Sequence, residues 1–242
     1  MIKNKILRID ALMQKRVGRY IIYAIGEIIL VMVGILLALK VNNWNESNKQ
    51  KQEELQILKE LRSDLEFTIE ELDTAAYYNR LMVNDLVNIR KYINEDLPYE
   101  QKLDTAFGNL DLWSMSYIPF VAYESLKNKG IDLISNDSLK NHITKFYEFN
   151  MQILMDDVGK WEWSFNQSTT QRMMINYVRR DDELNSPIAK PNNFEDLKTN
   201  VEFNNFINVL MHIRNDHVKT LLRVKARAEE LFQHINSEII QF

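Results

Sequence analysis

The pattern of hydrophobic positions changes once along the chain, and the change predicts two kinds of helix. From Tyr20 to Leu39 almost every residue is apolar, in the run YIIYAIGEIILVMVGILLAL. A helix rises about 1.5 Å per residue, so this run gives about 30 Å, which matches the hydrocarbon core of a bilayer. We therefore expect residues 20–39 to form one transmembrane helix.

The residues that flank this run agree with a membrane span. Tyr20 and Tyr23 would lie at one interface, Trp44 follows just beyond the other, and Lys40 can extend its ammonium group outward. A buried core helix rarely combines such flanks with this length. A cleaved signal peptide is a further alternative, but Ala38 precedes a leucine and a lysine, which make a poor cleavage site. The pattern favours an uncleaved signal anchor.

Beyond Trp44 the apolar residues recur at alternating spacings of three and four, which is typical of one buried helix face. We expect this helix to end near Asn94, because Pro98 disfavours helical geometry before it. Thr68 and Asn79 interrupt the apolar face and favour packing within a bundle over a free coiled coil. The positions on this face are Leu58, Leu61, Leu65, Thr68, Leu72, Ala75, Asn79, Met82, Leu86, Ile89 and Ile93.

Two further long helices are predicted, from Ser138 to about Asp182 and from about Val201 to Ile240. Shorter helices should fill residues 99–135, with Gly130 as a C-terminal cap, and Asn136 or Asp137 can cap the second long helix. The expected buried residues of the second are Ile143, Phe146, Phe149, Ile153, Leu154 and Trp161. Those of the third are Phe203, Phe206, Ile207, Leu210, Ile213, Leu221, Leu222, Leu231 and Ile235.

These elements predict an all-α protein: one N-terminal transmembrane helix, then an elongated antiparallel bundle of three long helices with shorter helices inserted, over residues 40–242. Composition agrees, because six glycines and four prolines in 242 residues are too few for a turn-rich β-sandwich or a doubly wound sheet. The chain has no cysteine, which excludes disulfides and thiolate sites.

Charge is distributed unevenly around the apolar run. Residues 1–19 carry one acidic residue, Asp10, and six basic residues: Lys3, Lys5, Arg8, Lys15, Arg16 and Arg19. By the positive-inside rule this basic stub is cytoplasmic and residues 40–242 are extracytoplasmic. Ile2, Ile6, Ile9 and Met13 make the stub amphipathic, so it can lie along the anionic inner leaflet. The rest of the chain is acidic and would repel nucleic acid.

No catalytic motif was found. The sequence has no glycine-rich phosphate loop, nucleophile elbow or zinc-binding His-Glu-x-x-His signature, so we predict no enzymatic activity, cofactor or metal. The four histidines are His142, His212, His217 and His234, and His212 and His217 are five residues apart, on different sides of a helix. We expect all four to be solvated or at the edge of the core.

Aromatic residues crowd two stretches, around Trp161 and around Trp113. They could line a small-molecule pocket between helices, although aromatics at helical spacing are more often core residues. The two groups are Phe146, Tyr147, Phe149, Trp161, Trp163 and Phe165, and Trp113, Tyr117, Phe120 and Tyr123.

Glu27 lies about 10 Å inside the predicted span. A carboxylate in lipid costs about 2.5–3.5 kcal/mol, so such a residue usually faces protein or water. Tyr23, Glu27, Gly34 and Ala38 share one helix face, and the two small residues let another helix approach closely. We interpret this face as a helix-association site; the alternative is a glutamic acid merely tolerated near the interface.

The run YAIGEIILVMVGILLALKVNNWNE, residues 23–46, resembles a family of uncharacterised single-pass membrane proteins of Bacteroidota. The run YESLKNKGIDLISNDSLKNHITKFYE, residues 123–148, is similar to the second recurrent block of that family. The family commonly has glutamine where this chain has Lys40. The resemblance implies an inner-membrane protein with a periplasmic helical domain, and it implies no activity.

The leading functional hypothesis is a non-catalytic, membrane-anchored interaction or scaffold protein of the cell envelope, either a homo-oligomer or an accessory subunit that binds another membrane protein. Its partners would be the lipid bilayer and these protein chains. An extracytoplasmic sensor is the first alternative, and because residues 1–19 are too short for a kinase or cyclase, it would act through a partner. An oligomeric ion pathway that uses a ring of Glu27 carboxylates is the second.

Overall fold

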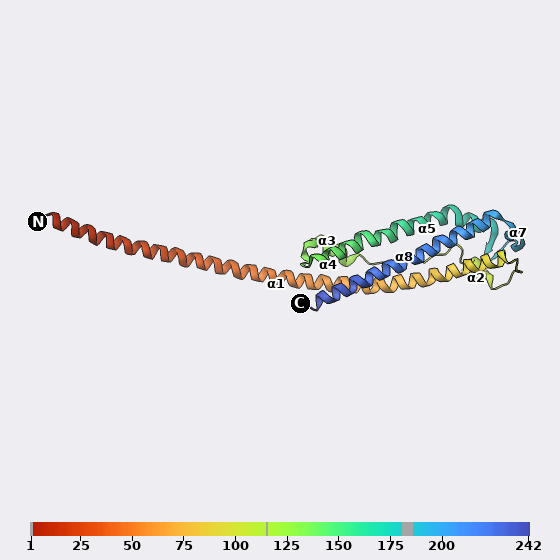
Figure 1. Cartoon of the computed structure of the whole chain (residues 1–242), viewed down its shortest axis with the longest axis horizontal. Helices are drawn as coiled ribbons and strands as arrows, with labels where there is room; N and C mark the ends of the chain where they lie inside the picture. Colours follow the sequence, from red (N-terminus) through yellow and green to blue (C-terminus); the bar gives the residue numbers. More distant parts are fainter. Residues whose placement is uncertain (1, 115, 181–185) are drawn as a thin grey trace. The chain divides into compact units, whose positions relative to one another are not determined.

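The computed structural model describes residues 2–114, 116–180 and 186–242, with side chains from residue 20 onward except those of 22, 157 and 158. The chain divides into two compact units, Met1–Glu53 and Glu54–Phe242, called here the N-terminal unit and the bundle. One helix, α1 (Ile2–Asn94), supplies the N-terminal unit and continues as the first long helix of the bundle (Figure 1). The prediction of an all-α protein is confirmed.

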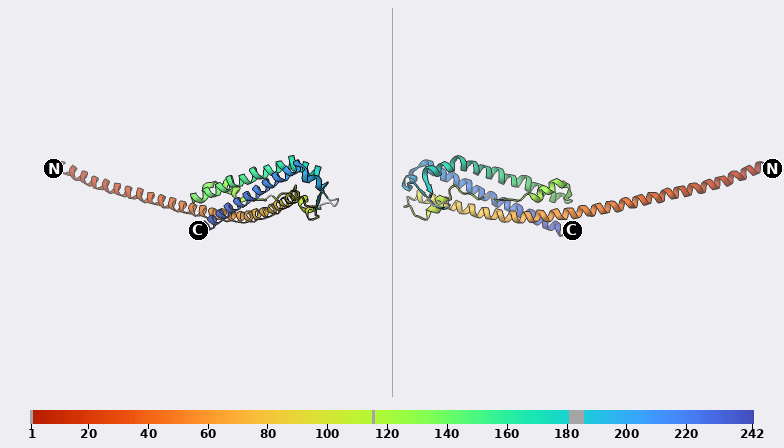
Figure 2. Two further views of the ribbon diagram at one scale, coloured as in Figure 1. Left: turned by 45° about the vertical axis from the view of Figure 1, so that its right-hand side comes forward. Right: turned by 180° about the vertical axis from the view of Figure 1, so that it is seen from behind.

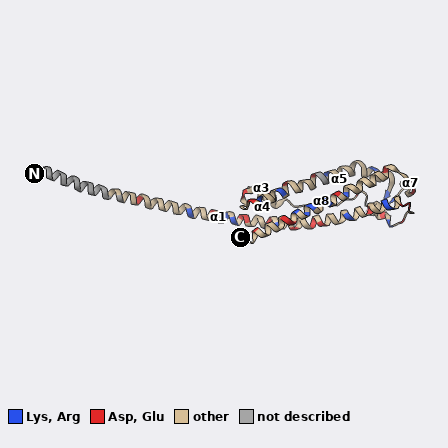
Figure 3. Cartoon of the chain, in the orientation of Figure 1, with Lys and Arg blue, Asp and Glu red and all other residues tan. Residues whose placement is uncertain are grey.

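The N-terminal unit is helical throughout its described residues. It contains a stretch that is long and apolar enough to cross a membrane, judged by length and composition, and no part of that stretch is buried. The side chains of the predicted stub 1–19, including Ile2, Ile6, Ile9 and Met13, lie outside the described residues. Figure 3 shows charged residues throughout the bundle, whereas Tyr20–Leu39 has Glu27 alone.

The bundle buries the predicted stripe of α1. All eleven stripe positions are buried except Met82, which is partly exposed. The two polar positions are satisfied: the Thr68 hydroxyl donates to the carbonyl of Asp64 at 2.7 Å, and the Asn79 amide donates to the carbonyls of Ala75 and Ser114 at 2.9 and 2.8 Å. Asn79 therefore joins α1 to the segment that contains Ser114, whereas Thr68 bonds within its own helix.

After Asn94, residues 95–136 return along α1 in the opposite direction. Their contacts descend α1 in order: Asn109 binds Asp85, Ala122 binds Asp64, and Ser135 binds Glu54. This connection contains α2 (Leu103–Gly108), α3 (Val121–Lys129) and the 3₁₀ turn η1 (Ile131–Leu133). Gly130 ends α3 with φ of 100°, a backbone conformation that favours glycine, as the sequence predicted.

The second long segment runs from Asp137 to Tyr177, and three π-helical segments interrupt it. Asn136 caps its first turn by accepting from the backbone N–H of Ser138 and Leu139. In chain order its elements are α4 (Asp137–Lys145), η2 (Phe146–Asn150), η3 (Ile153–Gly159), α5 (Lys160–Phe165), η4 (Asn166–Thr170) and α6 (Gln171–Tyr177), with η2, η3 and η4 the π-helical ones.

Two expectations for this segment were wrong. The helix ends at Tyr177 instead of continuing toward Asp182, because Val178 is extended and starts β1 (Val178–Arg180), which pairs antiparallel with β2 (Ala189–Pro191). Residue 182 itself lies outside the described residues. Phe149 and Trp161, expected to be buried, are exposed. A π-helical turn contains an extra residue, so each such turn rotates the following residues away from the face that a 3.6-residue period predicts.

The last long helix is α8 (Val201–Ile239), preceded by α7 (Phe194–Thr199). It buries the residues predicted for its face except Ile213, which is partly exposed, and Leu222, which is exposed. It runs antiparallel to α1, with Lys225 bound to Asp73. It also runs antiparallel to the 137–177 segment, because Glu238 binds Asn136 at the start of that segment. Figure 2 shows the three long segments side by side.

α1 and the 137–177 segment run in the same direction, whereas the sequence suggested antiparallel neighbours joined by short connections. The reason is the connection 95–136, which travels the length of the bundle before the second long segment begins.

The core consists of two hydrophobic clusters. On α8 one includes Phe203, Ile207 and Leu210, and the other begins at Leu221 and continues to Ile235. On α1 the cluster that contains Phe203 begins at Leu86, and the cluster that contains Leu221 ends at Ala76. Several buried polar residues lie between the clusters, and they form the candidate site in the bundle.

Candidate functional site

The predicted association face lies on α1, in the N-terminal unit. Tyr23, Glu27, Gly34 and Ala38 are all exposed, and a Cβ added to Gly34 would meet no atom within 4 Å. Among the described residues, no hydrogen bond or ion pair involves Glu27. The helix therefore places the four residues together on one face and offers them no partner from the chain described here.

The three predicted interface residues lie on the same helix. Tyr20, Lys40 and Trp44 are exposed, like the apolar residues between them. Tyr20 and Lys40 are twenty residues apart, which corresponds to about 30 Å along a helix. The spacing fits the role predicted for them and does not test it.

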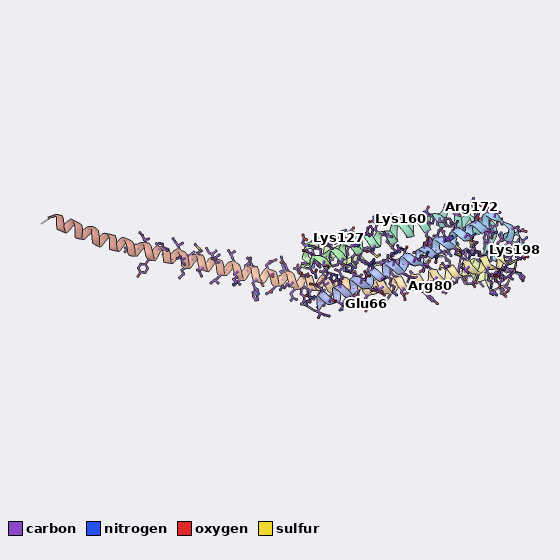
Figure 4. The ribbon with its side chains drawn as sticks, viewed as in Figure 1. Glu66, Arg80, Lys127, Lys160, Arg172 and Lys198 are labelled. Carbon is purple, nitrogen blue, oxygen red and sulfur yellow. The ribbon has the colours of Figure 1, made fainter. Side chains whose placement is uncertain are left out.

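A layer of buried polar side chains crosses the bundle between the two hydrophobic clusters, and we call it the polar layer. Each member is at most 3 % exposed; the members are Asn79, Glu162, Asn166, Arg214 and His217. Charged residues are almost never so fully buried unless they are paired. Many charged residues of the bundle are exposed, for example Glu66, Arg80 and Lys160 in Figure 4.

Glu162 of α5 is at the centre of this layer. Its Oε2 accepts a hydrogen bond from Nδ1 of His217 at 2.5 Å, and its Oε1 lies 3.6 Å from Nε of Arg214. In the described structure neither that Oε1 nor that Nε has a hydrogen-bond partner. In the interior, the Glu162 carboxylate thus contacts the imidazole of His217, which hydrogen-bonds to it, and the guanidinium cation of Arg214.

Arg214 joins Glu162 and His217 to the connecting segment 95–136. Its Nη1 donates to the carbonyl of Asn109 at 3.2 Å, and its Nη2 donates to that of Leu110 at 2.6 Å. These carbonyls follow the end of α2, where a cation is favourable. Burial lowers the pKa of Arg214 to about 10, and the charge of Glu162 opposes the shift. A guanidinium so buried depends on its neighbours to remain charged.

The local sequence explains why these side chains face inward. On α8, Arg214 and His217 continue the three-and-four spacing of buried residues that runs from Leu210 to Leu221. On the opposite segment, η2 and η3 precede α5, and the rotation that they introduce leaves Glu162 buried and Trp161 exposed. π-helical turns are frequent at functional sites.

A pocket of about 350 Å³ opens beside the polar layer, between α5 and α8. Its lining residues are Trp161, Val209, His212, Ile213, Asp216, His217 and Thr220. The two aromatic stretches, for which a pocket was the alternative to core packing, do meet, since the rings of Trp113 and Trp163 are 5.9 Å apart and those of Tyr123 and Tyr147 are 4.4 Å apart. Only Trp161 from these stretches lines this pocket.

A second histidine pair joins α4 to α8. The Nδ1 atoms of His142 and His234 are 3.2 Å apart, and both rings are partly buried. Burial, and secondarily the nearby ring of His234, lowers the pKa of His142. Within the described residues, no group of three or more histidine, aspartate or glutamate side chains could hold a metal ion.

The expectation that all four histidines would be solvated or at the edge of the core was wrong for His217. Sequence reasoning considered only the spacing between histidines and so missed the site. A usable signal was present: Arg214 and His217 occupy core positions of α8, where a charged or ionisable residue needs a buried partner. Glu162 could not be predicted from periodicity as this buried partner, because the π-helical turns change the helical period.

The comparisons with known proteins give a single match. A family model, described as a family of unknown function (DUF6090), matches residues 27–211. The matched range includes Glu27 and Glu162 and ends before Arg214. No curated protein and no solved structure matches the chain.

Proposed function

Because the chain belongs to the DUF6090 family, whose function is unknown, we propose its role from its own features: a non-catalytic, membrane-anchored interaction protein of the cell envelope. One observation carries the proposal. The apolar side chains between Tyr20 and Leu39 are exposed around the whole helix, and a soluble protein rarely exposes so much contiguous apolar surface. A lipid bilayer is the natural cover for a stretch of this length.

The proposed membrane is the inner one, with residues 1–19 in the cytoplasm and residues 40–242 in the periplasm. The support is the excess of lysine and arginine before the span. Protease added to spheroplasts should digest the bundle and spare a tag at the N-terminus. Protection of the bundle together with loss of the tag would reverse the proposed orientation.

The proposed interaction uses the α1 face that holds Glu27, Gly34 and Ala38. A carboxyl group in hydrocarbon is stabilised by a hydrogen bond from a neighbouring helix, and small residues allow that helix to approach. The partner is a second copy of the chain or another membrane protein. Glu27 has no partner in the described chain, which favours one from outside.

Crosslinking of native membranes tests this interaction. Gly34→Leu should abolish the crosslinked species, whereas Gly26→Leu, the same change about 90° away around the helix, should preserve it. Glu27→Gln should retain much of the association and Glu27→Leu should lose it, because glutamine keeps a hydrogen-bonding group. If Gln and Leu both abolish association, the contact requires charge. If Gly34→Leu and Glu27→Leu both leave the crosslinked species unchanged, this face is not the interface.

An extracytoplasmic sensor that acts through a partner is the second candidate. The observation that favours it is the pocket beside the polar layer, since a sensor requires a ligand site in its extracytoplasmic domain. A ligand that changes the crosslinking pattern of the full chain in membranes would favour the sensor over a scaffold.

A further inference from the structure

The pocket between α5 and α8 has chemistry that points to a class of ligand. Its wall includes His217, whose Nδ1 donates to Glu162. His217 lines the pocket and Glu162 does not, so the ring nitrogen that is not bound to Glu162, Nε2, is the one left for a contact in the pocket. A carboxylate that accepts from one histidine nitrogen fixes the tautomer and leaves the other nitrogen as a hydrogen-bond acceptor.

The charge at the pocket wall disfavours an anionic ligand. At the pocket wall Asp216 adds a carboxylate, which disfavours an anionic ligand. The best complement to this pocket is therefore a neutral group that donates a hydrogen bond.

The remaining walls favour a flat apolar body. Trp161 presents an indole that is 56 % exposed, and Val209 and Ile213 supply aliphatic surface on the facing helix. A volume of about 350 Å³ lies at the small end of ligand pockets, which suits a compound of one or two rings. Large half-exposed aromatics beside a few placed polar groups are characteristic of such sites.

We propose that this pocket binds a small neutral ring compound that carries a hydroxyl group, with the ring against Trp161 and the hydroxyl donating to Nε2 of His217. The inference goes beyond the proposed membrane interaction and does not depend on it. The Glu162 carboxylate and Arg214 are positioning residues in this account, because they orient the histidine and do not touch the ligand.

The test uses the full chain in detergent micelles and two matched probes, observed by fluorine NMR. The probes are 4-fluorophenol, which has the hydroxyl donor, and 4-fluoroanisole, in which a methyl group replaces the donated hydrogen. Empty micelles correct for partition of the rings into detergent. We expect saturable binding of 4-fluorophenol and about tenfold weaker binding of 4-fluoroanisole, the difference that one hydrogen bond makes.

Two variants assign the binding to this pocket. Val209→Trp should fill it and abolish saturable binding of both probes, while the melting temperature shows that the bundle is intact. Leu222→Trp, on the same helix outside the pocket, is the matched control and should bind as the unmodified chain does. His217→Phe should remove the preference for the phenol; if it fails to fold, Val209→Trp still decides.

Three results would overturn the proposal. They are the absence of saturable 4-fluorophenol binding above the empty-micelle control, binding that Val209→Trp leaves unchanged, and equal affinity for the two probes. Preferential binding of 4-fluorobenzoate over 4-fluorophenol would also overturn it, because it would show that the pocket selects an anion.

Discussion

Two stretches of α1 have the same helical backbone and opposite surroundings. Leu36, in the N-terminal unit, is 58 % exposed, whereas Leu61, in the bundle, is fully buried. The N-terminal stretch is apolar on every side, and the bundle stretch is apolar along one stripe. A stripe is covered by protein on one side, whereas a helix that is apolar all round is typical of a membrane span or of a fully buried helix. The comparison teaches that one continuous helix carries two different hydrophobic patterns.

Two carboxylates, Glu162 and Glu27, make the same comparison. Glu162 lies among protein side chains that supply both a cation and a hydrogen-bond donor, Arg214 and His217. Glu27 lies in an apolar stretch and has no such partner among the described residues. The bundle therefore compensates its carboxylate internally, and in our account Glu27 is compensated by another chain.

The largest effect should come from charging the apolar stretch. Val31→Arg combined with Ile35→Arg places two cations near the middle of the proposed span, where each costs about 2.5–3.5 kcal/mol. We expect the protein to leave the carbonate-washed membrane pellet for the supernatant. The matched control, Leu81→Arg with Val87→Arg, alters exposed residues of α1 in the bundle and should stay in the pellet. If the two double variants distribute equally between pellet and supernatant, the two stretches of α1 do not differ in their environment.

The next effect concerns the polar layer. Arg214→Met leaves Glu162 buried without its cation, and we expect the free energy of unfolding to fall by about 3–5 kcal/mol. Arg223→Met changes an exposed arginine of the same helix and should shift the free energy of unfolding by about 0.5 kcal/mol or less. Urea denaturation followed by circular dichroism measures both. Similar midpoints for the two variants would show that Arg214 does not stabilise the layer.

The bundle stripe should be sensitive to truncation. Leu61→Ala removes fully buried atoms and should lower the free energy of unfolding by about 2–5 kcal/mol. Leu81→Ala, on the same helix but 42 % exposed, is the control and should cost far less. A similar loss in both variants would mean that the stripe is not the packed face of α1.

The smallest effect concerns pH. The pKa of His142 is lower in the folded chain than in the unfolded one, mainly because of burial. The unfolded state therefore takes up a proton first as the pH falls below about 6.5, and stability decreases there. Charged neighbours add to or oppose the effect: His234, Arg227 and Lys145 lower this pKa, and Glu230 raises it.

Denaturation midpoints at pH 7.5 and pH 5.5 measure this dependence. His142→Gln removes the titrating group and should reduce the difference between the two midpoints. His212→Gln, which alters an exposed histidine, should leave that difference unchanged. If His142→Gln has no influence on it, the histidine pair is not responsible for the pH dependence.

The helices that keep one regular period could be predicted from the sequence. The stripe of α1, the end of that helix at Asn94, the caps at Gly130 and Asn136, and the extent of α8 all follow from spacing and local residue preference. The reversal along residues 95–136 could not be predicted, because it depends on contacts between residues far apart in sequence, such as Glu54 and Ser135.

The site in the bundle was only half predictable. Arg214 and His217 stand at core positions of α8, where spacing alone would mark them. Glu162 could not be placed, because η3 precedes it and π-helical turns shift its face away from the regular period. The association face on α1 needs only a regular helix, and its function stays a prediction.

The most direct measurement of the central claim is the accessibility of single cysteines in spheroplasts. The chain has no cysteine of its own, so Leu36→Cys and Leu81→Cys each introduce one unique thiol. Leu36 is the more exposed of the two in the isolated chain. If lipid covers the apolar stretch, a membrane-impermeant maleimide will label Leu81→Cys and will label Leu36→Cys only after denaturation in sodium dodecyl sulfate. Labelling of Leu36→Cys in intact spheroplasts as readily as Leu81→Cys would contradict the account.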